Sequence, residues 1–526
     1  MKNRHSSFLG CRGRRLTWMM AFTNVFPTFF IYAYNNAVTG GLLTLDSWVS
    51  LFPIIDTVHT TGAAQAQAAR VQGTAVAIYL VGCMLGSLSC IKLGDKYGRI
   101  KTIIAGNIVN VFGSIILVSS FSFAQLVVGR IVLGLGLGAI VATVPAWQAE
   151  SSLATHRGRF VVLEGTFPSL GLVAFQFIDL GCFFDNTSFS WRFPLAIPLL
   201  FNFLMLSTIP FLPESPRWLV KKGRIEEAVE ILAILDDVSP DSPRIAEGIR
   251  HMQRSLETMS QGSMVGILRD KENKMKFRTL VCLFITFYWS LNGAGLIGFY
   301  TVPIFSSLGV SAIIARVLSG SMYAWQVPCC MLAYLLVDRL GRRFLLLLGA
   351  AGMGIVFVIM AVCVSLVPAN KAAMIIAAVA MYGFGFFYSM SLGVNWLYPT
   401  EITPLGYSTQ IYALSTASQF ALTFMVVEVS PIGITNLGWK YFIVFAAINL
   451  GLLFPVVYLF FPETTGHSLE DMDVTFRTPT GPFGVVKASK HVRQDTVLHP
   501  SGEVEVQDLE MENERKVGTV LEIDQV

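Results

Sequence analysis

Long apolar stretches dominate the sequence and limit what it can fold into. About twelve of them approach the roughly 20 residues that cross a bilayer as one helix. With 53% hydrophobic and only 14% charged residues among 526, the chain carries more apolar surface than one water-soluble globule buries. We therefore expect an all-α membrane protein with spans near residues 18–43, 74–93, 103–123, 125–147, 160–182, 193–212, 278–306, 313–336, 344–367, 373–397, 408–429 and 440–461.

A short charged turn occurs twice, each time between two apolar stretches. The first copy runs from Gly94 to Arg99, and the second from Val337 to Arg343. A turn duplicated at matching points is typical of transporters built from two repeated halves. The expected organisation is an N-terminal segment, a six-helix bundle, a cytosolic linker with short helices, a second six-helix bundle and a largely disordered cytosolic tail, at residues 1–17, 18–212, 213–276, 277–461 and 462–526.

Basic residues predict the orientation of the chain. Lys96, Arg99, Arg157, Arg159 and Arg342 fall in loops of one parity, which the positive-inside rule assigns to the cytosol together with both termini. The net charge of +4 does not indicate a nucleic-acid surface. The cysteines and histidines show no ligand spacing and no nucleophile–base arrangement, so we expect no metal, no cofactor and no enzyme activity.

Seven motifs occur in an order that resembles one family, the sugar porters of the major facilitator superfamily, and especially its fungal members. The motifs are Gly94 to Arg99; Gly129-Arg130; Pro145 with Glu150 and Arg157; Pro213-Glu214-Ser215-Pro216-Arg217-Trp218; Asp338 to Arg343; Trp396-Leu397-Tyr398-Pro399 with Glu401; and Pro462-Glu463-Thr464-Thr465-Gly466.

The resemblance implies a transporter whose two bundles rock about a central cavity. It also implies a small organic solute such as a sugar or polyol, and a plasma-membrane protein that functions as a monomer in the lipid bilayer. Charges at cytosolic helix ends are suited to latching the inner mouth, because bonds between helices there must break when it opens. The expected inner-gate residues are Asp95, Arg99, Arg130, Glu150, Arg157, Asp338, Arg342, Arg343 and Glu401.

The second half departs from the family pattern at the latch. Six residues separate Glu150 from Arg157, but the same spacing from Glu401 ends at Ser408. Arg342 or Arg343 remains available to pair with Glu401. We expect an asymmetric latch, weaker in the second half by on the order of 1 kcal/mol.

The cavity positions of the family are also changed. Aligned on the resemblance, its paired glutamines become Trp289 and Ser290, an asparagine becomes Gly295 and a further glutamine becomes Gly165. Gln419, Phe420 and Thr423 stand where Asn, Trp and Asn are usual. One interpretation is a larger, more apolar cavity for a secondary metabolite; the other is that amides such as Asn292, Gln326 and Asn395 replace the lost ones. A sugar sensor is a less favoured alternative. The expected cavity residues are Asn35, Glu164, Gly165, Trp289, Ser290, Asn292, Gly295, Tyr300, Trp396, Gln419 and Thr423.

Two further features concern coupling and modification. Asn35 stands where proton-coupled members carry Asp, and an amide does not titrate, which favours facilitated diffusion. Glu164 is the competing proton site, unless it forms a fixed pair with Arg130. Asn186 begins a weak glycosylation sequon on a loop expected outside.

Overall fold

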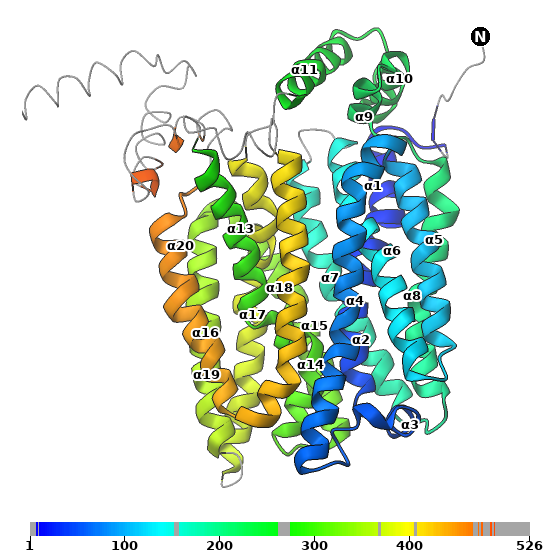
Figure 1. Ribbon diagram of the computed structural model, residues 1–526. Coiled ribbons are helices and arrows are strands. Elements are labelled where there is room, and N and C mark those ends of the chain that lie inside the picture. Colours follow the sequence, from blue (N-terminus) through cyan, green and yellow to red (C-terminus); the bar gives the residue numbers. More distant parts are fainter. Residues whose placement is uncertain are drawn as a thin grey trace, which may run out of the picture.

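The computed structural model describes residues 7–8, 10–151, 157–260, 274–366, 370–403, 408–465, 472, 475–476, 484–486 and 489. These residues are almost entirely helical, and eleven helical runs among them are long and apolar enough to cross a membrane. The long helices stand side by side as two groups, one from each half of the chain (Figure 1). An all-α membrane fold is therefore confirmed.

The first half supplies six long helical segments, of which all but α7 (Arg157–Cys182) are among these eleven runs, and the first of them is interrupted. It consists of α1 (Gly13–Met20), a π-helical turn (Ala21–Val25) and α2 (Phe26–Leu42). The others are α4 (Gly62–Tyr97), α5 (Arg99–Val118), α6 (Phe123–Glu150), α7 and α8 (Phe189–Thr208) with its 3-10 extension (Ile209–Phe211).

The second half repeats the arrangement. Its crossings are α13 (Met275–Leu291) with α14 (Ala294–Ser307), then α15 (Ala312–Leu340), α16 (Arg342–Leu366), α17 (Lys371–Ile402), α18 (Ser408–Leu437), and α19 (Lys440–Ala447) with a π-helical turn (Ile448–Leu453) and α20 (Phe454–Phe460). Across the two halves, α4 packs against α18, α7 against α15, and α2 against α14.

Among the differences from the predicted boundaries, two change the course of a crossing. The second crossing begins at Gly62 rather than near residue 74, so α3 (Asp46–Leu51) and a 3-10 turn (Pro53–Ile55) fill a shorter loop. The span expected at 278–306 is broken, because Gly293 has a φ of +99°, a left-handed conformation that favours glycine and ends α13. The break separates two half-helices inside one crossing.

The linker contains the short helices that its charge pattern predicts. They are α9 (Pro216–Lys221), α10 (Ile225–Asp236) and α11 (Pro243–Ser260), and they share a small apolar core that includes Trp218, Leu219 and Ala228. They lie at the same end of the bundle as α1, which contacts α10 (Figure 1). We call this end the linker end and the other the opposite end. The expected tail lies almost entirely outside the described residues.

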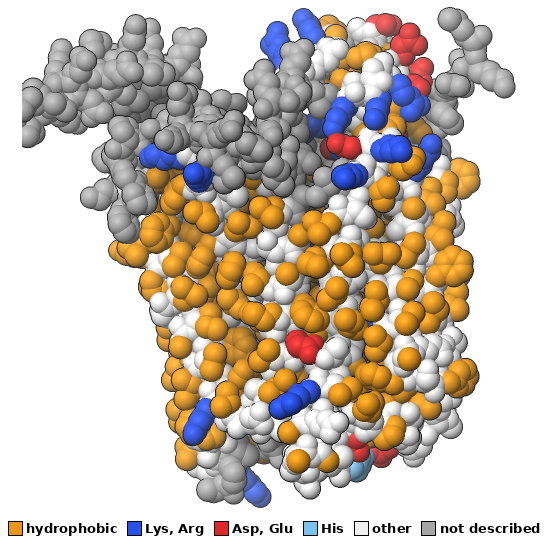
Figure 2. Space-filling model, in the orientation of Figure 1, with side chains coloured by type: hydrophobic (Ala, Val, Ile, Leu, Met, Phe, Trp, Pro, Cys, Tyr) orange, Lys and Arg blue, Asp and Glu red, His pale blue; other side chains and the backbone are white. Residues whose placement is uncertain are grey.

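The face shown in Figure 2 carries a broad hydrophobic band over the long helices, whereas most of the charged side chains on this face gather at the linker end. Inside the first half, helices approach closely through glycine. A Cβ at Gly134 would lie 2.0 Å from the Tyr79 carbonyl oxygen, and one at Gly138 would lie 2.0 Å from that of Cys83. Small residues at such spacing let α6 contact α4 backbone to backbone, as membrane helices commonly do.

Candidate solute cavity and gating contacts

A cavity lies between the two halves, in the middle of the bundle. Its walls come from α2 and α7 of the first half and from five helices of the second, α13, α14, α15, α17 and α18. Aromatic rings dominate the lining, which includes Phe29, Tyr32, Trp289, Phe299, Tyr323, Phe384 and Tyr388. A mostly apolar cavity with few polar groups is the usual form of a site for a small organic molecule.

The polar groups of the cavity include two amides, Asn36 and Gln326. Gln326 is 3% exposed, and the Asn36 side-chain oxygen has no hydrogen-bond partner among the described residues. Ser290 is already engaged, because its hydroxyl lies 3.2 Å from the Thr423 hydroxyl and donates to the Gln419 carbonyl at 3.3 Å. A bound solute that offers hydroxyl groups would form hydrogen bonds with the two amides.

Four of the residues expected in the cavity line it: Trp289, Ser290, Gly295 and Thr423. The side chains of Glu164 and Trp396 lie outside the described part of the chain, so their places stay predictions. Asn36 was not anticipated, although it directly follows Asn35 in the sequence. One residue rotates a helix face by about 100°, and only the packing of α2 shows which of the two amides faces inward.

Three other expected cavity residues form hydrogen bonds with backbone groups of the helices around the cavity instead. Asn35 donates from its amide to the Ile31 carbonyl of its own helix at 2.9 Å. Asn292 accepts a bond from the Ala294 N–H at 2.8 Å and so caps α14 at the break. The Tyr300 hydroxyl donates to the Val427 carbonyl at 3.1 Å. None of these side chains, nor that of Gln419, lines the cavity in the described structure.

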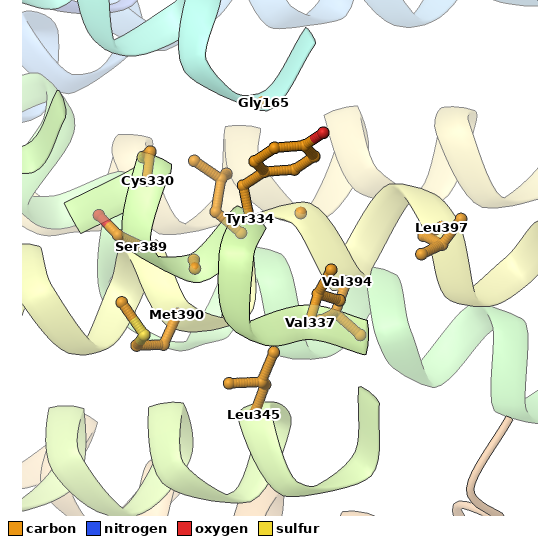
Figure 3. Close-up of a pocket in the computed structure, with 12 residues that line it drawn as sticks. Gly165, Cys330, Tyr334, Val337, Leu345, Ser389, Met390, Val394 and Leu397 are labelled. Atoms are coloured by element: carbon orange, nitrogen blue, oxygen red, sulfur yellow. The ribbon is translucent and has the colours of Figure 1, made fainter. Parts of the chain in front are cut away.

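A second, smaller cavity lies between α7 of one half and α15, α16 and α17 of the other. Gly165 forms its wall on α7, and Tyr334 reaches toward it from α15 (Figure 3). The remaining lining is largely apolar and includes Val337, Leu345 and Leu397. Because Val337 and Leu397 lie near the linker ends of their helices, this cavity lies on the linker side of the central one.

The first charged turn forms a cluster at the linker end. Arg99 holds Glu150 with two hydrogen bonds, Nε to Oε2 and Nη2 to Oε1, both at 3.0 Å. Ser215 also donates its hydroxyl to Glu150 Oε2, at 2.5 Å. The neighbouring Glu214 accepts from the backbone N–H of Arg99 at 3.0 Å and from that of Ile100, where α5 begins. The cluster ties α5 and α6 to the start of the linker.

The second charged turn forms the matching cluster. Arg342 directs Nε and Nη2 to one oxygen of Glu401, at 3.2 and 3.0 Å, and Nη1 to Asp338 at 2.9 Å. Thr464 donates to the other Glu401 oxygen at 2.5 Å, and Glu463 accepts from the Arg342 N–H at 2.9 Å. Arg342 pairs with Glu401 through one carboxylate oxygen, whereas Arg99 uses both oxygens of Glu150.

Each of these clusters lies within one half of the molecule rather than across the mouth. Arg99 and Glu150 both belong to the first half, and Arg342 and Glu401 to the second. Burial raises the pKa of Glu214 above its ordinary value, and the bonds that it accepts from backbone N–H groups partly offset this effect. Arg343 instead donates to the Tyr458 carbonyl at 2.6 Å. The Arg157 and Ser408 side chains lie outside the described residues.

Arg130 lies elsewhere than the expected inner gate. It is buried on α6, 20 residues before Glu150, which places it roughly 30 Å away along the helix. Its guanidinium lies over the Tyr79 ring, 5.4 Å from the centroid, and one of its terminal nitrogens has no partner among the described residues. Arg130 is therefore not part of the clusters at the linker end. Its expected pairing with Glu164 involves a side chain outside the described structure.

The opposite end of the bundle is tightly closed. A Cβ at Gly40 would lie 2.0 Å from the Phe299 carbonyl oxygen, so α2 and α14 touch backbone to backbone there. Thr74 of α4 donates to Glu428 of α18 at 2.7 Å, a hydrogen bond that crosses between the halves. Asn186 is exposed in the loop between α7 and α8 at this end, and the hydroxyl of Thr187 in its sequon is bonded to Asp185.

Comparison with known proteins identifies the class that this architecture defines. The family described as "Sugar (and other) transporter" matches residues 20–476. The chain belongs to this family, the sugar transporters of the major facilitator superfamily, and it is a transporter of sugar-porter type rather than an enzyme.

Similar relatives are fungal, and a similar solved structure is bacterial. The chain is 34% identical to the MFS-type transporter oryC of Aspergillus oryzae, over 85% of this chain and 83% of that protein. It is 30% identical to the sugar transporter STL1 of Saccharomyces cerevisiae, over 90% and 83%. The fold is similar to that of the proton:xylose symporter XylE, with a TM-score of 0.74 at 20% identity over 88% of this chain and 99% of XylE.

Proposed function

We propose that the protein carries a small sugar or polyol across the plasma membrane as a monomer by facilitated diffusion, with both termini and the linker end in the cytosol. The observation that carries the proposal is a pair of amide side chains, Asn36 and Gln326, on the walls of a largely apolar cavity between the halves, where the Asn36 oxygen has no partner among the described residues. Hydroxyl groups of a sugar bond to such amides, and its C–H faces pack against rings such as Trp289.

Facilitated diffusion is proposed because the first crossing offers no carboxyl group to the cavity. Asn35 and Asn36 are both amides, and Asn35 is bonded within its own helix. Protons are therefore not expected to drive uptake through this helix.

A less hydroxylated organic solute is the second candidate. Aromatic and aliphatic side chains make up most of the central lining, and the smaller cavity on the linker side is largely apolar. Desolvating a highly hydroxylated solute in such surroundings costs more free energy than desolvating a flatter, more apolar one.

Uptake of labelled hexoses, pentoses and polyols in a transporter-null cell tests the proposal, with and without a protonophore. We expect saturable uptake of at least one of these compounds that the protonophore leaves unchanged. Loss of uptake with the protonophore would contradict facilitated diffusion. Absence of uptake for the whole panel, with the protein present at the cell surface, would contradict the sugar or polyol assignment and favour the less polar solute.

A further inference from the structure

A fully buried ion pair joins the two halves near the opposite end. Arg316 Nε donates to Asp179 Oδ2 at 2.9 Å, and both side chains have 0% exposure. Asp179 lies in the last turn of α7, in the first half, and Arg316 lies near the start of α15, in the second half. The pair therefore bonds one half to the other, unlike the pairs of Arg99 with Glu150 and of Arg342 with Glu401.

The ion pair also contacts a third helix, α2. Arg316 Nη2 donates to the Thr44 hydroxyl at 2.8 Å and to the Gly41 carbonyl at 3.5 Å, both at the end of α2. A side chain at Gly41 would collide with Asp179, since a Cβ there would lie 2.6 Å from Oδ1. The Arg316 guanidinium also lies over the Phe183 ring, 4.0 Å from its centroid. These contacts exclude water from the pair.

Burial makes this pair difficult to separate without compensation. Removing one partner, or drawing the two apart in an apolar environment, leaves an uncompensated charge, whereas water can solvate both charges once the site opens. The ends of α7 and α15 must part for a solute to enter the cavity from this side, because they belong to different halves. The pair therefore favours the state in which the opposite end is closed.

We propose that Arg316 and Asp179 form the gate of the opposite end and separate in each transport cycle. The two residues position the halves and need not touch the solute. The free-energy cost of separating them opposes the opening of this end. The contacts of Arg316 with Thr44 and Gly41 make α2 part of the same gate. The gate does not depend on which solute is carried.

The test measures access to the cavity from each side of the membrane. Asn36→Cys supplies a reporter thiol in the cavity, and Asn186→Cys marks the side that the opposite end faces. Labelling by an impermeant thiol reagent is measured on intact cells and on inside-out vesicles, and the rate of the same variant without the added cysteine is subtracted. The variants are Asp179→Asn, Arg316→Gln and the double substitution, with Glu227→Gln on the exposed α10 as the control.

We expect the double variant to label at Asn36→Cys roughly tenfold faster than the parent, and only from the side on which Asn186→Cys reacts. The double variant is decisive because it leaves no unpaired buried charge and so does not depend on the folding of the single variants. An unchanged rate in the double variant, with surface expression retained, would overturn the proposal. So would faster labelling from the linker side, or strictly additive effects of the two single substitutions.

Discussion

Two amide side chains set the chemistry of the cavity at the residue scale. Gln326 is buried at the cavity wall, and the Asn36 side-chain oxygen has no hydrogen-bond partner among the described residues. A buried amide without a partner is costly, so a solute that bonds to it recovers free energy on binding. The same amides penalise a solute that lacks hydroxyl groups, which makes them the natural source of selectivity.

Substituting Gln326 tests this role. Gln326→Ala removes the amide, and we expect a solute with hydroxyl groups to need about a tenfold higher concentration for half-maximal uptake, which corresponds to the loss of one or two hydrogen bonds. Concentration-dependent uptake at equal surface expression measures the effect. Gln253→Ala, on the exposed surface of α11, serves as the control and should leave uptake unchanged. An unaltered concentration dependence for Gln326→Ala would contradict the assignment.

At the scale of single elements, acidic side chains cap the helices that follow the two charged turns. Glu214 accepts backbone N–H bonds at the start of α5, and Glu463 does so at the start of α16. The glycines before these helices, Gly98 and Gly341, have φ values of +94° and +90°, which favour glycine at both turns. The duplicated motif therefore encodes the same helix start twice.

Loss of the first cap should destabilise the protein. Glu214→Ala removes the acceptor of the Arg99 and Ile100 N–H groups, and we expect a loss of about 1–2 kcal/mol in the free energy of unfolding. Thermal unfolding in detergent measures it as a lower midpoint temperature. Glu226→Ala, in the first turn of the exposed α10, should change the midpoint much less. Equal midpoints for the two variants would argue against the cap.

The periodicity and length of the apolar stretches predicted the crossings well, because membrane spans are encoded locally. The extension of α4 from Gly62 was missed because Gln65, Gln67, Arg70 and Gln72 make that segment polar, although α4 is helical there. The Arg316–Asp179 pair could not be predicted either. These residues are 137 apart in sequence, and only the packing of α7 against α15 brings them together.

The whole molecule combines two kinds of contact. Charge clusters at the linker end stabilise each half internally, and the contacts that close the opposite end join one half to the other. A rocking transporter requires that each half stays rigid while the contacts between the halves change. The resemblance predicted the charged residues of both clusters, and the sequence already suggested that Arg342 or Arg343 pairs with Glu401; the structure adds the pairing of Arg99 with Glu150.

The asymmetry predicted for the linker end is tested at Ser408. Ser408→Arg restores the charge that the family carries, and we expect it to slow labelling of Gly165→Cys from the linker side about fivefold, the equivalent of about 1 kcal/mol. Gly165 lines the cavity on that side. Ser408→Gln adds a long polar side chain without the charge and should have little effect. Equal labelling rates for the two variants would contradict the predicted asymmetry.

Locking the opposite end shut tests the central claim, that the halves must part there in every cycle. Thr74 Oγ1 lies 2.7 Å from Glu428 Oε1 across the halves, and a Cβ at the neighbouring Gly73 would lie 2.3 Å from the Glu428 carbonyl oxygen. Because the two backbones approach closely here, cysteines at positions 74 and 428 are suited to oxidative cross-linking. We predict that oxidising the Thr74→Cys, Glu428→Cys double variant abolishes uptake of its solute and that a reductant restores it, while each single variant is insensitive to the oxidant. Undiminished uptake by the fully cross-linked protein would contradict the account.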